Sequence, residues 1–282
     1  MTKEKARAKF TEMVARSENE LELDRAALLI AAEEYPFMDV EKYLDQIGAF
    51  AERARSRDDL YADPLSRIMR LSDLVFGEWG FRGNVEDYFD ARNSFLNDVI
   101  DRRTGIPITL SVLFLEIARR IGLKLFGVGM PGHFVVKFVG DENEILIDPF
   151  NGGRLLSEEK CREMIEEMYG GEMKFHPAFL YAVTKKQILT RMIQNLKGIY
   201  ARAGDHHKTL GAIERALIIH TGEEPDGANE IRDRGLVYSG MGRYGMALAD
   251  LEEYLKRAPQ APDAKEMRER IKQLRQKQAQ LN

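Results

Sequence analysis

Two side chains suited to proton transfer lie at the ends of neighbouring apolar stretches of the chain. His133 opens the stretch HFVVKFV, and Asp148 ends the stretch EILID. A histidine can take a proton from a nucleophile, and a carboxylate bonded to the ring orients that histidine. The chemistry needs a thiol or hydroxyl as its third member. The only cysteine, Cys161, follows both stretches in LLSEEKCREMIEEM, a helical pattern, so we interpret it as an ordinary helix residue.

The two apolar stretches read as a β-hairpin, because the polar segment GDEN separates them. Alternation along the strands puts His133 and Asp148 on the same face of the sheet. A four-residue turn sets Val135 opposite Asp148, which makes His133 and Asp148 diagonal neighbours, and a two-residue turn sets them directly opposite. Either register permits a His–Asp contact. The other face carries Phe134, Val136, Phe138, Ile145 and Ile147.

A helix is predicted before the hairpin, in GIPITLSVLFLEIARRIG. Thr104 or Gly105 can cap it, Pro107 suits its first turn, and Gly122 is well placed to end it. The helix is apolar on most sides, which predicts a central position in the core.

Thr109 and Ser111 are the hydroxyls of this helix. Ser111 lies one turn beyond Pro107, a displacement of about 5.4 Å along the axis. A serine inside an apolar helix more often bonds a carbonyl one turn back than acts as a nucleophile.

The rest of the chain is predicted to be helical. Pro36 separates two amphipathic helices near the N-terminus, and Asp39 can cap the second. In the last hundred residues GLVYSGMGRYGMALADLEEYLKRAP resembles a tetratricopeptide repeat (TPR), and Tyr200 and Gly204 repeat the pattern of Tyr238 and Gly242. The predicted division has N-terminal helices at 1–60, a core at 61–182, and helical repeats with a C-terminal helix at 183–282.

Three segments together carry a resemblance to a known family. YFDARNSFLNDVIDRRTGIPITLSVLFLEIARRIGL, GVGMPGHFVVKF and IDPFNGG resemble the bacterial SirB-type family, whose transglutaminase-like region is followed by TPR repeats. The same core recurs in some eukaryotic F-box proteins. The resemblance implies an α+β fold: N-terminal helices, a transglutaminase-like (papain-like) core with a small antiparallel sheet, and an all-α TPR-like module.

The resemblance also indicates where a nucleophile would lie. Active relatives in the wider superfamily carry a G-x-C motif at the start of the helix, and counting back from Gly122 places that cysteine at Pro107. His133 and Asp148 match the remaining positions of the triad. The thiol of the superfamily is therefore absent, so enzymatic activity is uncertain and we lean against it.

Several interpretations of these residues stay open. The preferred one is a non-catalytic scaffold for a protein or peptide partner, with a possible regulatory role, and the alternative is a hydrolase or acyl-transfer enzyme using Ser111 or Thr109 with His133 and Asp148. His133 and Asp148 can also be a purely structural pair, or bind a ligand. Asn93, in ARNSFLN, caps a helix or faces the same site, and Asp148 can simply begin the turn before Pro149.

The composition restricts the partners. The net charge of −4 with mixed signs gives no reason to expect nucleic acid, and no apolar run approaches the roughly 20 residues needed to cross a bilayer. One cysteine and five histidines without ligand spacing predict no metal and no cofactor. The N-terminus lacks a secretion signal, so we expect a cytoplasmic protein. The sequence leaves the oligomeric state open.

Overall fold

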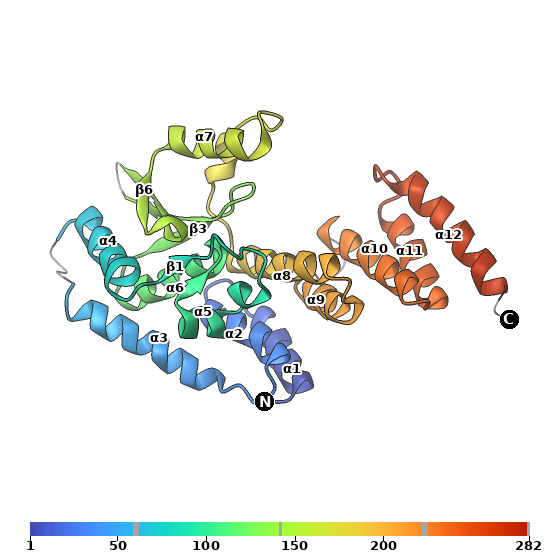
Figure 1. Cartoon of the computed structure of the whole chain (residues 1–282), viewed down its shortest axis with the longest axis horizontal. Coiled ribbons are helices and arrows are strands. Elements are labelled where there is room, and N and C mark those ends of the chain that lie inside the picture. Colours follow the sequence, from blue (N-terminus) through green and yellow to red (C-terminus); the bar gives the residue numbers. More distant parts are fainter. Residues whose placement is uncertain (59–61, 141–142, 221–224, 281–282) are drawn as a thin grey trace. The chain divides into compact units, whose positions relative to one another are not determined.

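The computed structural model describes residues 1–58, 62–140, 143–220 and 225–280 of the chain. It divides into two compact units, Met1–Met192 and Ile193–Asn282 (Figure 1). The first unit contains helices and a small antiparallel sheet, and the second is helical, which confirms the predicted α+β class. The three-part domain division stays a prediction.

The first unit begins with helices. Asp39 caps the third of them as predicted, because its Oδ1 accepts hydrogen bonds from the backbone N–H groups of Glu41 (3.1 Å) and Lys42 (3.3 Å). The predicted break at Pro36 is confirmed, since it lies between the second and third helices. The four helices are α1 (Lys3–Val14), α2 (Leu23–Glu34), α3 (Val40–Arg55) and α4 (Pro64–Ser72).

The main sheet is antiparallel, with the strand order β3-β4-β5-β6. Val136 pairs with Ile147 and Val139 with Glu144, which is the register of a four-residue turn. Residues 141–142 of the predicted GDEN turn lie outside the described residues. The strands are β3 (Leu125–Val128), β4 (Val135–Val139), β5 (Glu144–Asp148) and β6 (Arg154–Leu156).

Two of these strands were not predicted. Only the hairpin of β4 and β5 was predicted, because β3 and β6 are too short to show a clear alternation. A second, parallel pair joins β1 (Arg82–Gly83) to β2 (Thr104–Gly105). Two-residue strands of this kind depend on the contacts around them rather than on their own sequence.

The helix α6 (Pro107–Arg120) is the centre of the first unit. Every side chain from Pro107 to Ala118 is buried, which confirms the predicted central position. It contacts α2, α3, α5 (Leu96–Arg102) and the strands β3 and β4. After it, Gly122 has a φ of +79°, a conformation that suits glycine at a helix end.

The start of α6 differs from the prediction. Ile106 occupies the cap position. The backbone N–H of Ile106 donates a hydrogen bond to the hydroxyl of Thr109 at 3.2 Å. Thr104 and Gly105 form strand β2 instead, paired with β1. Pairing with a distant strand therefore overrides the local capping preference of Thr104.

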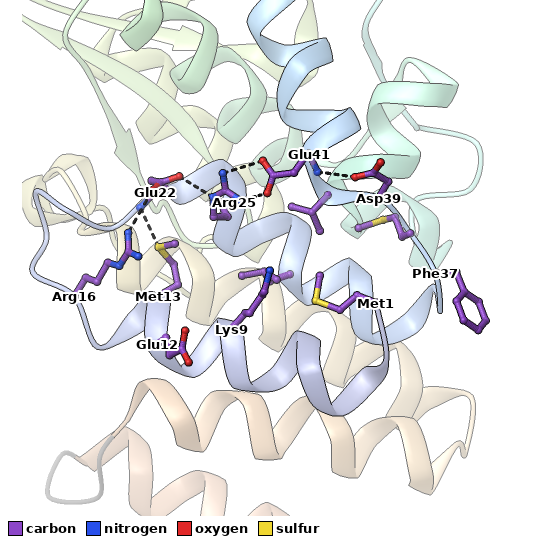
Figure 2. Close-up of a pocket in the computed structure, with 13 residues that line it drawn as sticks. Met1, Lys9, Glu12, Met13, Arg16, Glu22, Arg25, Phe37, Asp39 and Glu41 are labelled. Atoms are coloured by element: carbon purple, nitrogen blue, oxygen red, sulfur yellow. Dashed lines mark hydrogen bonds and ion pairs between the residues drawn. The ribbon is translucent and has the colours of Figure 1, made fainter.

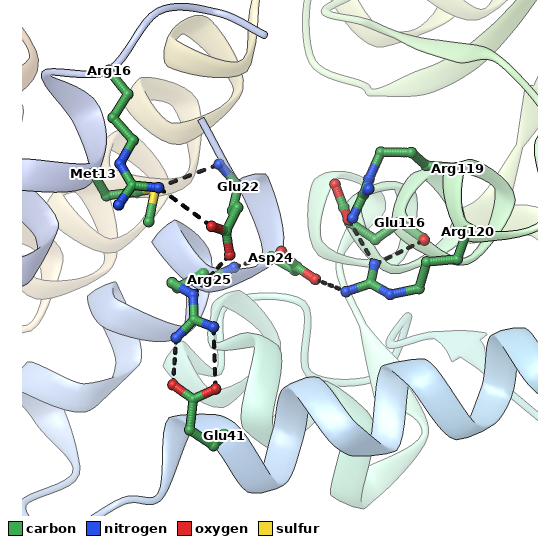
Figure 3. Close-up of polar contacts among 9 residues, drawn as sticks. All are labelled: Met13, Arg16, Glu22, Asp24, Arg25, Glu41, Glu116, Arg119 and Arg120. Atoms are coloured by element: carbon green, nitrogen blue, oxygen red, sulfur yellow. Dashed lines mark hydrogen bonds and ion pairs between the residues drawn. The ribbon is translucent and has the colours of Figure 1, made fainter. Parts of the chain in front are cut away.

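Buried charges fix the other end of α6 (Figure 3). Arg120 bonds Glu116 one turn back and Asp24 of α2, so one guanidinium joins the two helices. Burial, and then the nearby charge of Asp24, raise the pKa of Glu116. Two almost fully buried carboxylates are stabilised here because arginines neutralise them.

The second unit repeats one geometry. Gly204 and Gly242 have φ values of +70° and +72°, and each ends a helix. After each glycine, the next backbone N–H bonds back to a tyrosine carbonyl, of Tyr200 at 3.0 Å and of Tyr238 at 2.9 Å. The predicted correspondence is thus present in the backbone. Helix α8 (Lys185–Arg202) begins in the first unit and ends in the second. The helices that follow are α9 (His206–Ile219), α10 (Pro225–Gly240), α11 (Tyr244–Arg257) and α12 (Ala264–Ala279).

Candidate functional site

A tight turn places His133 at the entry to β4. The backbone N–H of His133 bonds the carbonyl of Met130 at 3.3 Å, and Gly132 between them has a φ of +69°. Pro131 followed by such a glycine is the sequence of a type II turn. The turn formed by the motif MPGH therefore fixes the backbone position from which the His133 side chain extends.

The structure brings His133 and Asp148 together. The ring Nε2 of His133 lies 3.0 Å from Oδ1 of Asp148, and the exposed fractions of the two residues are 7% and 0%. If Nε2 carries the proton that bonds Asp148, Nδ1 is the nitrogen left to accept one. No described residue forms a hydrogen bond with Nδ1. The pair has the orientation that a general base requires.

Asp148 also organises the loop that follows β5. Its Oδ1 accepts a bond from the backbone N–H of Asn151 at 3.2 Å, and its Oδ2 accepts one from the Asn151 amide at 2.7 Å. Arg154 lies 3.4 Å from Oδ2. Burial acts to raise the pKa of Asp148, but the hydrogen bond and charge of His133 and the bonds from Asn151 outweigh it, so the net shift is downward.

The two candidate hydroxyls are bonded to backbone carbonyls. Ser111 donates to the carbonyl of Pro107 at 2.8 Å, and Thr109 donates to the carbonyl of Asn93 at 2.7 Å. Within the described residues, neither hydroxyl forms a hydrogen bond with His133. A nucleophile needs that bond at about 2.6–3.2 Å to lose its proton to the ring, although resting enzymes often show a looser contact.

Asn93 is a structural junction. Its amide donates to the carbonyls of Asp87 at 2.7 Å and Tyr88 at 3.3 Å, and its side-chain oxygen accepts from Asn84 at 3.1 Å. The predicted capping role is wrong, because Phe95 occupies the cap position of α5 without a side-chain bond. Asn93 instead holds the loop before it and, through its own carbonyl, the start of α6.

Cys161 lies on α7 (Glu158–Tyr169) and is fully buried. Burial, followed by the charges of Asp148 and Glu158, raises the pKa of its thiol to about 11. A reactive cysteine needs the opposite, a thiolate stabilised near neutral pH. Cys161 therefore does not replace the missing thiol.

Three residues near His133 were not identified from the sequence. The ring of Phe150 lies edge-on to His133 at 6.1 Å between centroids and to Tyr88 at 5.9 Å. Arg191 donates from Nη2 to the carbonyl of His133 at 2.9 Å. Arg191 is 58 residues from His133 along the chain, and no local pattern could connect them.

A cavity of about 650 Å³ lies elsewhere in the first unit, between α1, α2 and the start of α3 (Figure 2). Ion pairs close one of its walls, because Arg25 bonds both Glu22 and Glu41, and Arg16 bonds Glu22 (Figure 3). None of the predicted site residues lines this cavity. Its size suits a small ligand, but both of its arginines are already paired with glutamates of the same wall.

The described residues contain neither a candidate membrane span nor a candidate metal cluster. No helix there is long and apolar enough to span a membrane. No cluster of three or more His, Cys, Asp or Glu side chains in the same residues is arranged to hold a metal ion.

The chain matches two family descriptions. Residues 41–194 match the transglutaminase-like superfamily, and residues 196–272 match the tetratricopeptide repeat. The first match contains all the candidate site residues, and the second covers the repeats predicted from Tyr200 and Tyr238.

Similar proteins occur in bacteria and in a mammal. A UPF0162 protein of Xylella fastidiosa is 37% identical over 85% of each chain, and one of Haemophilus influenzae is 30% identical over 82% of this chain and 84% of its own. The F-box only protein 21 of Mus musculus is 34% identical over 48% of this chain and 22% of its own.

Among solved structures, menin, crystallised to reveal its binding site for Mixed Lineage Leukemia protein, gives a TM-score of 0.43 at 11% identity. The structural match covers 94% of this chain and 73% of the menin chain. That likeness is too weak to support a conclusion. The extended matches to the bacterial proteins and to the superfamily are decisive: the chain belongs to the UPF0162 family and has a transglutaminase-like domain followed by tetratricopeptide repeats.

Proposed function

We propose that this protein is a non-catalytic transglutaminase-like and TPR protein that binds a protein or peptide partner, with a regulatory role. His133 and Asp148 serve recognition and structure in this proposal rather than bond cleavage. A cytoplasmic location, membership of the narrower SirB-type group and the division at 60 and 182 are parts of the same proposal.

The observation that carries the proposal is the state of the nucleophile positions. Pro107, where the resemblance places the superfamily cysteine, has neither a thiol nor a hydroxyl, and Thr109 and Ser111 are bonded to backbone carbonyls. The imidazole of His133 is oriented by Asp148 but has no nucleophile bonded to it among the described residues. A base without a nucleophile can still hold a ligand through its free ring nitrogen.

The repeats supply a second argument. Tetratricopeptide repeats commonly bind proteins, and this module occupies residues 196–272. Their helices cross closely, since a Cβ on Gly235 would lie 3.0 Å from the side chain of Leu251. We expect this module to contribute a partner surface separate from His133.

A turnover assay tests the non-catalytic part. The full chain is incubated with a panel of peptides, esters and amides, beside His133→Ala and the control His207→Ala, which changes an exposed histidine. We expect no turnover that depends on His133. Turnover that is lost in His133→Ala and kept in His207→Ala would contradict the proposal.

A selection experiment tests the binding part. Peptides displayed on phage are selected on the intact chain, synthesised, and titrated against the same three proteins by fluorescence anisotropy. We expect a selected group whose dissociation constant rises in His133→Ala and is unchanged in His207→Ala. Selection of no peptide with this dependence would argue against recognition at His133.

A further inference from the structure

Arg191 presents a cationic group beside the His133–Asp148 pair. It lies on α8 in the first unit, where its Nη2 donates to the carbonyl of His133 at 2.9 Å. Its guanidinium is 5.9 Å from the centre of the Phe134 ring. An arginine side chain has five N–H donors. Among the described residues, only the His133 carbonyl accepts a hydrogen bond from the Arg191 guanidinium.

The charge of Arg191 is not neutralised by the described part of the chain. No carboxylate there forms an ion pair with it, and the ionisable groups near enough to affect its pKa are the phenols of Tyr88 and Tyr169. Burial is the main cause that lowers the pKa of Arg191. Asp148, the nearby acid of the site, already accepts bonds from His133 and Asn151.

This situation differs from that of Arg67 and Arg120. Arg103, which is also partly buried, forms no ion pair with a described carboxylate either, and its guanidinium lies over the rings of Phe50 and Phe81. Arg67 pairs with Asp58 at 2.6 Å, and Arg120 pairs with Asp24 and Glu116. A half-buried guanidinium normally has such a partner, because losing water is costly for an ion that nothing compensates. Arg191 therefore has the environment of a binding group.

Aromatic rings lie beside His133. Tyr88 contacts Phe150, and Phe150 contacts His133. Phe89, which packs on Tyr88 at 5.3 Å, is 59% exposed. We call Tyr88, His133, Phe150 and Arg191 the Arg191 face. It combines one unpaired cation, one free imidazole nitrogen and apolar rings.

We propose that the Arg191 face binds the carboxylate of a ligand that also carries an aromatic or large apolar group. Arg191 would hold the carboxylate oxygens, His133 Nδ1 would accept a hydrogen bond, and the rings of Tyr88 and Phe150 would pack against the apolar group. One guanidinium neutralises one negative charge, which favours a carboxylate over a phosphate dianion. The inference rests on the proposed binding function and specifies the chemistry of its ligand.

The experiment uses N-acetyl-L-phenylalanine, its amide, and inorganic phosphate as probes. The full chain, labelled with ¹³C at the histidine rings, is titrated with each probe, and the His133 signal is assigned from its loss in His133→Gln. We expect a saturable shift of this signal with the acid, and a dissociation constant at least about tenfold higher for the amide and for phosphate.

Two variants separate binding from folding. Arg191→Gln should weaken binding of the acid about tenfold or more, and Arg191→Lys should restore part of it. Arg162→Gln is the control, because Arg162 also lies over an aromatic ring, that of Phe175 at 4.6 Å, but on α7. Each variant is first checked for an unchanged urea unfolding midpoint.

Three outcomes would overturn the inference. They are equal binding of acid and amide, equal binding of the acid by Arg191→Gln and the intact chain, and no saturable shift with any probe. Equal binding of acid and amide would leave the proposed binding function standing. Turnover of a probe that requires His133 would overturn the proposed function while leaving carboxylate binding intact.

Discussion

At the scale of the residue, Asp148 shows how a structural role and a chemical one can coincide. The same Oδ1 that accepts the bond from His133 also caps the turn that ends at Asn151. Loss of catalysis would therefore remove only one of the two reasons to keep an aspartate here. The presence of the pair is accordingly weak evidence for activity, and the proposed non-catalytic role rests on the carbonyl bonds of Thr109 and Ser111.

Replacing Asp148 by asparagine should make stability less dependent on pH. The pKa of Asp148 is lower in the folded protein, so its charge stabilises the fold above the unfolded value of about 3.9, and this stabilisation is lost as the pH falls through the folded pKa. We expect Asp148→Asn to lower the free energy of unfolding by about 2 kcal/mol at pH 7, and by less at pH 3. Urea unfolding at both pH values measures the difference.

The control for that experiment is Asp45→Asn, which changes an exposed carboxylate of α3. It should have almost the same stability as the intact chain at both pH values. A loss in Asp148→Asn that is the same at pH 7 and pH 3 would show that the charge of Asp148 does not contribute.

The two hydroxyls of α6 should differ in their effect on stability. Thr109→Val removes the hydroxyl that bonds the Asn93 carbonyl and the Ile106 N–H. The free energy of unfolding should therefore fall by about 1–3 kcal/mol. Ser111→Ala removes a bond to the Pro107 carbonyl, which helix bonding still satisfies, so the loss should be below about 1 kcal/mol. Thermal unfolding of the two variants compares them, and a larger loss in Ser111→Ala would contradict this account.

Sequence reasoning identified some of the site and missed the rest for a physical reason. His133 and Asp148 were found because strand alternation and a short turn fix which side chains share a face. Arg191 was not found, since only the folded chain brings α8 to the turn before β4. Tyr88 and Phe150 were missed likewise, because ring contacts between loops leave no periodic pattern.

At the scale of the element, long periodic segments were predictable and short ones were not. The burial of α6 followed from its unbroken apolar sequence, and the register of β4 and β5 from the spacing of their alternation. Strands β1, β2 and β6 have two or three residues, too few for a pattern. Their positions depend on neighbours such as Phe150.

Phe150 gives a direct test of how β1 is held. A Cβ on Gly83 would lie 2.6 Å from the Phe150 ring and 2.7 Å from its carbonyl oxygen, so Gly83→Ala must displace Phe150 or β1. We expect a loss of about 1–3 kcal/mol in the free energy of unfolding, measured with urea. The matched change Gly48→Ala, in α3 with no atom within 4 Å of the added carbon, should stabilise the protein by about 0.5–1 kcal/mol. Equal effects of the two changes would contradict the close contact.

At the scale of the whole molecule, the chain combines a transglutaminase-like unit with a repeat module, and each has its own packing. The core of the second unit includes Tyr238, Leu251 and Tyr254, which are all in that unit. The repeats were predictable because the same glycine and tyrosine spacing occurs twice. The position of the superfamily cysteine was assigned to Pro107 only through the resemblance, since spacing alone does not identify position 107.

A change in the repeat module should leave the His133–Asp148 pair intact. Gly235→Leu places a side chain where α10 meets Leu251 of α11, and we expect it to destabilise the second unit by about 1–3 kcal/mol. The control is Gly198→Ala in α8, where an added carbon meets only Arg202 at 3.8 Å. Urea unfolding measures stability and the His133 ring signal reports the site. A shifted His133 signal in folded Gly235→Leu would show that the site depends on the repeats.

The most direct test of the account is to ask whether any hydroxyl of the intact chain is activated by His133. The full chain, His133→Ala and His207→Ala are each incubated with a fluorophosphonate and weighed by intact-protein mass spectrometry. The account predicts no adduct that depends on His133, because Pro107 is inert and Thr109 and Ser111 are bonded to carbonyls. An adduct on Ser111 or Thr109 that disappears in His133→Ala and persists in His207→Ala would contradict it and identify an enzyme.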